Sequence, residues 1–209
     1  MITRSFWICA AAFALPWLAS ASSIAIGTPN LFGSGLSPTF GTLVNFDSLT
    51  PFSTVSSNAF AAEGVSSITN DPSTNDLIVE PFSEQSPPNF LTTTDPNGAG
   101  DIDFTFANLT NEVGIGIAED GTTQTTLTVF GATGNVLGSF VETVPSSTFN
   151  AYYVITDPTA DIKSFSINAT QNLAVDDLQF VPTPEPAGIS LAGVGAALLA
   201  GFIRRRKQV

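Results

Sequence analysis

Residues 101–106 read Asp-Ile-Asp-Phe-Thr-Phe and give the clearest strand signal in the chain. Polar and apolar residues alternate there, so Ile102, Phe104 and Phe106 share one face of an extended strand. Similar segments lie at 112–118, 124–130, 136–141, 149–156, 161–168 and 173–181. No long stretch between residues 22 and 181 repeats its apolar residues at the helical spacing. The pattern therefore predicts an all-β domain.

Turn residues separate these segments and favour antiparallel pairing. The run Gly131-Ala132-Thr133-Gly134-Asn135 is typical of a hairpin turn. Weaker strand signals precede it at 42–47, 64–68 and 76–80. Strands recurring about every 10–12 residues predict an antiparallel β-sandwich of roughly eight to ten strands, which suits a jelly roll better than an immunoglobulin-like domain. The chain has 17 phenylalanines and two tyrosines, Tyr152 and Tyr153, and those between residues 22 and 181 are expected to fill the core.

The alternation in the last two segments also predicts which side chains share a face. Along 161–168, one face should carry Ile162, Ser164, Ser166 and Asn168, and the other Lys163, Phe165 and Ile167. Along 173–181, one face should carry Val175, Asp177, Gln179 and Val181, and the other Ala174, Asp176, Leu178 and Phe180.

The charge balance excludes several classes of protein. Between residues 22 and 181 there are 17 acids and one base, Lys163, a net charge of −16 that would repel nucleic acid. Such a surface either attracts divalent cations or serves solubility alone. The chain has no histidine, and its single cysteine is Cys9, so Ser-His triads, thiol catalysis and Cys/His zinc sites are excluded. Paired carboxylates, as in glycoside hydrolysis, remain open.

The N-terminal residues 1–21 resemble a secretory signal peptide. Arg4 precedes an apolar core from Phe6 to Leu18, and Ala19-Ser20-Ala21 fits the small-x-small rule of signal peptidase. We expect export by the general secretion machinery and cleavage after Ala21; an uncleaved anchor helix is the alternative. The segment 22–181 is then a single domain.

The C-terminal residues 182–209 have three parts in order. Pro182-Thr183-Pro184-Glu185-Pro186 comes first, and an apolar segment at 187–203 follows, which would make a helix of roughly 25 Å, near the short end of membrane spans. The basic end is Arg204, Arg205, Arg206 and Lys207, and basic flanks stay cytoplasmic. Glu185 should therefore lie outside the inner membrane.

Pro184-Glu185-Pro186, the small apolar helix and the terminal arginines together resemble the PEP-CTERM sorting signal of Gram-negative bacteria. The resemblance implies processing by an exosortase, a membrane-tethered precursor, and a role in exopolysaccharide or biofilm. The body, with Asn45-Phe46-Asp47-Ser48-Leu49 near its start and Val175 to Phe180 at its end, looks like other PEP-CTERM bodies, which are similar to carbohydrate-binding-module-like β-sandwiches. It departs from them in having no tryptophan, since Trp7 and Trp17 both lie in the signal peptide.

Two acidic groups are candidate calcium sites. If the first and last strands pair, Asp47, Asp176 and Asp177 would meet at one rim; otherwise they only start and cap turns. The loop from Asp95 resembles an EF-hand in its ligands Asp95, Asn97, Asp101 and Asp103, but Ala99 and Phe106 replace two others, so a polar loop entering a strand is the alternative.

A third acidic group, Glu119-Asp120-Gly121, is expected to be a solvated turn.

The sequence as a whole predicts an exported, non-enzymatic envelope or matrix protein with a structural, adhesive or polysaccharide-associated role. The alternatives are a carbohydrate-active hydrolase with paired carboxylates and a permanently membrane-anchored surface protein.

Overall fold

The computed structural model describes residues 21–27, 40–70, 77–81, 88–94, 100–119, 121–144, 149 and 151–183. Residues 1–20 of the predicted signal peptide and the tail from residue 184 lie outside these ranges, and so does the predicted membrane span at 187–203. Within the described ranges, no helix has the length and apolar character needed to cross a membrane.

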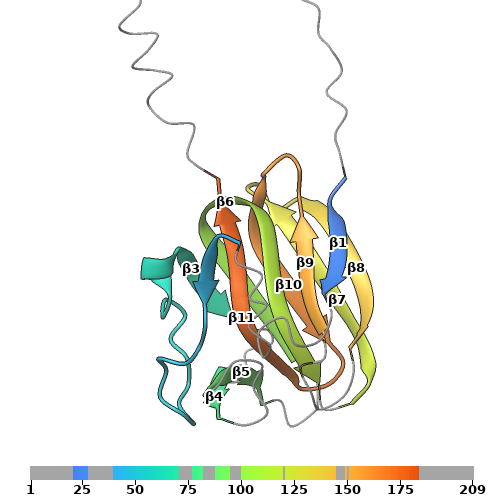
Figure 1. The fold of residues 1–209 in the computed structure, drawn as a ribbon. Coiled ribbons are helices and arrows are strands. Elements are labelled where there is room, and N and C mark those ends of the chain that lie inside the picture. Colours follow the sequence, from blue (N-terminus) through green and yellow to red (C-terminus); the bar gives the residue numbers. More distant parts are fainter. Residues whose placement is uncertain are drawn as a thin grey trace, which may run out of the picture.

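The described residues form eleven strands and one short 3₁₀ helix, η1, and every strand pairing is antiparallel (Figure 1). In chain order these are β1 Ser23–Gly27, β2 Thr42–Val44, η1 Ala61–Glu63, β3 Val65–Thr69, β4 Leu77–Glu80, β5 Phe90–Thr93, β6 Gly100–Glu119, β7 Thr123–Gly131, β8 Val136–Val144, β9 Ala151–Thr156, β10 Ile162–Ala169 and β11 Leu173–Pro182. The all-β, antiparallel prediction is confirmed.

Strand β6 joins the two halves of the sheet. Its first part pairs with β10 and β3, with Phe104 opposite Phe165, and its second part pairs with β11 and β9. The first half-sheet therefore contains β3, the start of β6, β10, β7 and β8. The second contains β4, β5, β11, the end of β6, β9 and β1, with β2 also on β11. The sequence segments 101–106 and 112–118, predicted as separate strands, are thus one continuous strand.

A single apolar core lies between the two half-sheets. Phe104 and Phe165 stack within the first half-sheet, with ring centroids 6.4 Å apart, and Phe106 contacts Phe180 of the second at 4.8 Å. Tyr153 belongs to the same core, and Tyr152 is also fully buried. The predicted phenylalanine-rich core is confirmed, and the half-sheets face each other as in a sandwich (Figure 1).

Two irregularities change the predicted faces. The register of β10 shifts between Ile162 and Ser164, so Ile162 is buried together with Phe165 and not exposed beside Ser164. The register of β11 shifts between Asp176 and Gln179, where Asp177 has a φ of 53°. Because one extra residue moves all later side chains to the other face, the assignments based on strict alternation are wrong at these two points.

Candidate functional site

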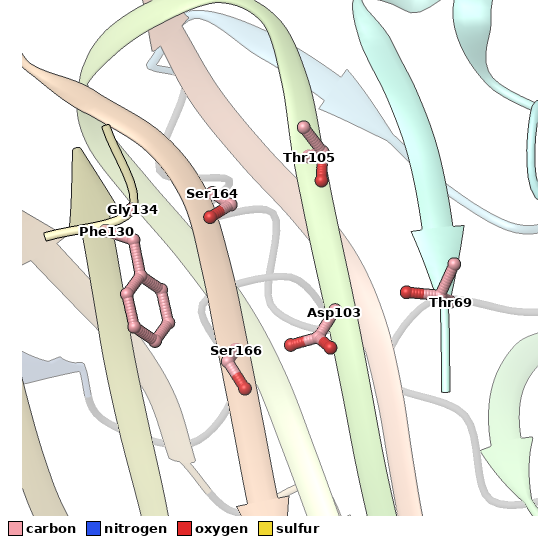
Figure 2. Close-up of a pocket in the computed structure, with 7 residues that line it drawn as sticks. All are labelled: Thr69, Asp103, Thr105, Phe130, Gly134, Ser164 and Ser166. Atoms are coloured by element: carbon pink, nitrogen blue, oxygen red, sulfur yellow. The ribbon is translucent and has the colours of Figure 1, made fainter. Parts of the chain in front are cut away.

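An open groove lies on the outer face of the first half-sheet (Figure 2). Its volume is about 430 Å³, within the range of roughly 300–1,000 Å³ typical of ligand sites. Its lining, which we call the hydroxyl groove, consists of Thr69, Asp103, Thr105, Phe130, Gly134, Ser164 and Ser166.

Strand alternation places these side chains on the outer face. On β6, Ile102, Phe104 and Phe106 point into the core, so Asp103 and Thr105 point outward. On β10, after the register shift, Phe165 and Ile167 are buried, so Ser164 and Ser166 lie on the same outer face. The irregularity that made the sequence-based face assignment wrong at Ile162 therefore lies directly beside the groove.

The groove residues form rows across neighbouring strands. Asp103 lies opposite Thr69 on β3 and opposite Ser166 on β10, and Ser166 in turn lies opposite Thr128 on β7. Ser164 lies between Thr105 and Phe130 in the next row. Since paired strands are about 4.8 Å apart, hydroxyl and carboxylate groups repeat at that spacing across the sheet.

Polar contacts continue beyond the groove on the same face. Thr128 and Ser139 share a hydrogen bond of 3.1 Å, and the side-chain amide of Asn168 donates to Asp101 at 3.3 Å. Lys163 lies away from this row, because its Nζ donates to the carbonyl of Ala107 at 2.7 Å. The groove lining therefore offers hydroxyls, one carboxylate and one aromatic ring, and it contains no basic side chain.

The first predicted calcium group is only partly brought together. β2 and β5 both pair with β11 on its outer edge, so Asp47, just after β2, approaches the start of β5. There the backbone amide of Asn89 donates to Asp47 Oδ1 at 3.2 Å, and Asn45 donates to its Oδ2 at 2.8 Å.

The other two members of this group lie at the bulge of β11. Asp176 Oδ1 accepts the backbone amide of Asp177 at 2.8 Å, and both side chains are fully buried. Among the described residues, no group of three or more His, Cys, Asp or Glu side chains is arranged to hold a metal ion. Calcium binding by Asp47, Asp176 and Asp177 stays a prediction.

The second calcium group and the sorting residues fall largely outside the described ranges. Asp95 and Asn97 lie outside them, whereas Asp101 and Asp103 belong to β6 itself. Of the predicted cleavage residues, Ala19 lies outside and Ala21 just precedes β1. The sorting residues Pro184, Glu185, Pro186, Arg204, Arg205, Arg206 and Lys207 all lie outside.

The prediction of a solvated turn at Glu119 is wrong. Glu119 is the last residue of β6 and only 2% exposed, and its Oε1 accepts a hydrogen bond from the Thr125 hydroxyl. Among the residues that the structure describes, no hydrogen-bond partner is found for its buried Oε2. Burial raises the pKa of Glu119 to about 7. The side chain lies inside the sandwich because the inward positions 113, 115 and 117 continue to 119.

Glu119 has acidic and aromatic neighbours. Burial first, and then the charges of Glu142 and Glu119, raise the pKa of Tyr153 to about 12. Glu142 lies on β8 opposite Thr125, whose hydroxyl contacts Glu119. This end of the core thus holds two carboxyl groups, and no ion pair is found to either of them in the part of the chain that the structure describes.

Comparison with known proteins gives structural likenesses alone. No protein-family model matches the chain, and no curated protein matches it in sequence. An exo-β-agarase structure is similar over 69% of this chain and 26% of its own, with 12% identity and a TM-score of 0.47. The K2 adhesin domain of Lys-gingipain is similar over 66% of this chain and 98% of its own, with 13% identity and a TM-score of 0.47.

A third likeness is to the family 11 carbohydrate-binding module of a cellulosomal cellulase of Clostridium thermocellum. It covers 69% of this chain and 97% of the module, with 7% identity and a TM-score of 0.38. The chain spans about a quarter of the length of the first of these structures, the agarase. With TM-scores below 0.5, these likenesses do not assign a ligand or an activity to this chain.

Proposed function

We propose that this chain is an exported, non-enzymatic protein of the cell envelope or extracellular matrix, whose jelly-roll-like sandwich binds a polysaccharide in the hydroxyl groove. The observation that carries the proposal is the lining of that groove: Thr69, Thr105, Ser164 and Ser166 offer hydroxyls in cross-strand rows, beside the ring of Phe130. Hydroxyl groups both donate and accept hydrogen bonds, which suits a ligand with many hydroxyls of its own.

The aromatic ring and the shape of the groove add to this support. An apolar ring face can pack against the C–H face of a sugar, and Phe130 stands at the groove wall (Figure 2). The groove is open, and its lining residues extend across the strands from β3 to β7, which suits an extended polymer. A polymer would contact several rows at once, which raises affinity without a deep pocket.

A binding panel tests this proposal. The mature protein, purified after export, is titrated with soluble neutral, amino and acidic polysaccharides, together with Phe130→Ala and the double variant Ser164→Ala/Ser166→Ala. Both variants should weaken binding at least several-fold, because they remove the ring or two central hydroxyls. Thr122→Ala, an exposed position outside the groove, is the matched control and should bind as the wild type does. Unchanged binding by both groove variants would refute the assignment.

A hydrolase remains the second candidate, because two carboxylates lie on the outer face of β6. Asp101 and Asp103 are two residues apart on one strand, so their backbone positions are roughly 7 Å apart along it, which is compatible with the separation of about 5–9.5 Å between the carboxyl groups of glycosidases. Asp103→Asn and Asp101→Asn separate the two functions. Lost turnover with retained binding would favour the hydrolase, whereas our proposal expects no turnover by the wild type.

The sorting part of the proposal is supported by the sequence of the tail and by the position of β11. β1 begins and β11 ends at the same end of the sandwich, so both terminal segments connect there (Figure 1). We propose that an exosortase processes the tail near Pro184-Glu185-Pro186 after insertion of 187–203 in the inner membrane. Mass spectrometry of the mature C-terminus should find a truncated chain, and Glu185→Ala should retain the tail. An intact tail on the wild-type protein would show a permanent anchor.

A further inference from the structure

We propose that Asp103 makes the hydroxyl groove selective for a polysaccharide that carries free amino groups, in preference to neutral or acidic chains. This inference rests on the proposed function, since it names the ligand class of the same groove. Asp103 is the one carboxylate among the seven lining residues, and no basic side chain lines the groove with it.

The position of Asp103 places its charge in the middle of a row of hydroxyls. It lies opposite Thr69 on one neighbouring strand and Ser166 on the other, and its carboxylate points into the groove (Figure 2). It is only partly buried, so it remains accessible to a ligand. A ligand unit bound at the centre of the groove therefore meets this carboxylate, with hydroxyl groups on both sides.

Nothing in the described part of the chain neutralises this charge. No ion pair or side-chain hydrogen bond is found for Asp103 there, and Lys163, the one base between residues 22 and 181, contacts the carbonyl of Ala107. Asp101 on the same face accepts a hydrogen bond from Asn168, which leaves Asp103 as the acceptor that faces the groove.

The chemistry of these groups decides which sugar unit is favoured. A protonated amine would donate a charge-assisted hydrogen bond to the carboxylate, and such bonds are roughly twice as strong as neutral ones. A uronic acid would place like charges together, which is unfavourable at close range. A neutral sugar can donate a hydroxyl to Asp103 but lacks the attraction between opposite charges, so the amino sugar should bind most tightly.

The test compares three probes on the mature protein at a pH of about 6, where an ordinary amine is protonated. The probes are a β-1,4-linked glucosamine hexamer, its N-acetylated counterpart and an oligogalacturonate, each measured by titration calorimetry. We expect the glucosamine hexamer to bind about fivefold to tenfold more tightly than the N-acetylated one, and the oligogalacturonate to bind most weakly.

Two matched variants separate Asp103 from the general negative charge of the protein. Asp103→Asn and Asp101→Asn each remove one charge from the same face of the same strand, so any unspecific attraction of a polycation should fall equally in both. The inference expects the preference for the glucosamine hexamer to fall much further in Asp103→Asn than in Asp101→Asn.

The outcomes distinguish this inference from the proposal beneath it. Equal binding of both hexamers by the wild type, or a preference that falls no further in Asp103→Asn than in Asp101→Asn, overturns the role of Asp103 but leaves polysaccharide binding intact. Failure of all three probes, together with failure of the wider polysaccharide panel, overturns the proposed function and this inference with it.

Discussion

Replacing Glu119 with Gln should remove most of the pH dependence of stability between about pH 4.5 and 7. Glu119 is 2% exposed, and burial raises its pKa from 4.5 to about 7. The folded protein therefore holds a proton that the unfolded chain releases in this range. The stability that Glu119 contributes is highest below pH 4.5, falls as the pH rises towards 7, and levels off above it.

The magnitude follows from the shift in the pKa. A shift of about 2.5 units, at 1.36 kcal/mol for each, corresponds to about 3 kcal/mol between the acidic and the alkaline limit. This is a large fraction of the 5–15 kcal/mol that is usual for a folded domain. For a domain of this size it corresponds to roughly 6–12 °C in the unfolding midpoint.

Urea unfolding of the wild type and of Glu119→Gln at several pH values between 4 and 8 measures this difference. As the pH rises across this range, the free energy of unfolding of the wild type should fall by about 3 kcal/mol more than that of the variant. Glu63→Gln, at an exposed position of η1, is the control and should follow the wild-type curve. Parallel curves for the wild type and Glu119→Gln would refute the reasoning.

Three further predictions concern stability. Gly114→Ala should destabilise the protein by about 1–3 kcal/mol in urea unfolding, because its Cβ would lie 2.7 Å from the ring of Tyr152; a neutral effect would contradict the packing. Burial would raise the pKa of Asp157, but hydrogen bonds led by those from Thr159 and Ser22 outweigh it and lower the pKa. The ionised carboxylate thus stabilises the fold at pH values above the usual pKa of an aspartate, and this stabilisation is lost on acidification. Asp157→Asn should therefore lower the free energy of unfolding by about 1–2 kcal/mol at neutral pH and flatten the acid limb of the curve of stability against pH. If calcium binds through Asp47, a hundredfold excess over its dissociation constant should stabilise the protein by roughly 2.7 kcal/mol relative to EDTA. An unfolding midpoint that is the same with calcium and with EDTA would refute calcium binding.

The sequence predicts the core of this fold well, because the alternation of polar and apolar residues along a strand indicates which side chains are buried. Ile102, Phe104 and Phe106 are buried as the pattern indicates, and so are Leu127 and Val129. The alternation fails where a strand gains an extra residue, at the register shifts of β10 and β11. A bulge leaves no mark in a sequence of polar and apolar residues, so strict alternation cannot place the residues beside it.

The hydroxyl groove could not be predicted from one sequence. It combines residues of β3, β6, β10 and the β7–β8 hairpin, which only the strand order brings together. The sequence predicts Asp103 both in the strand at 101–106 and as a calcium ligand, but alternation alone does not show that this position faces a groove. Glu119 is different, because its odd-numbered position after Val113, Ile115 and Ile117 already carried the signal for burial.

Mapping the bound ligand on the protein by NMR tests the central claim most directly. The mature protein is titrated with the oligosaccharide that binds most tightly in the panel, and shifts of the backbone amides are followed. The account predicts that the largest changes fall on Thr69, Asp103 and Ser166, which form one row of the hydroxyl groove. Changes concentrated instead on the second half-sheet, around β11 and β9, or no change with any oligosaccharide, would contradict it.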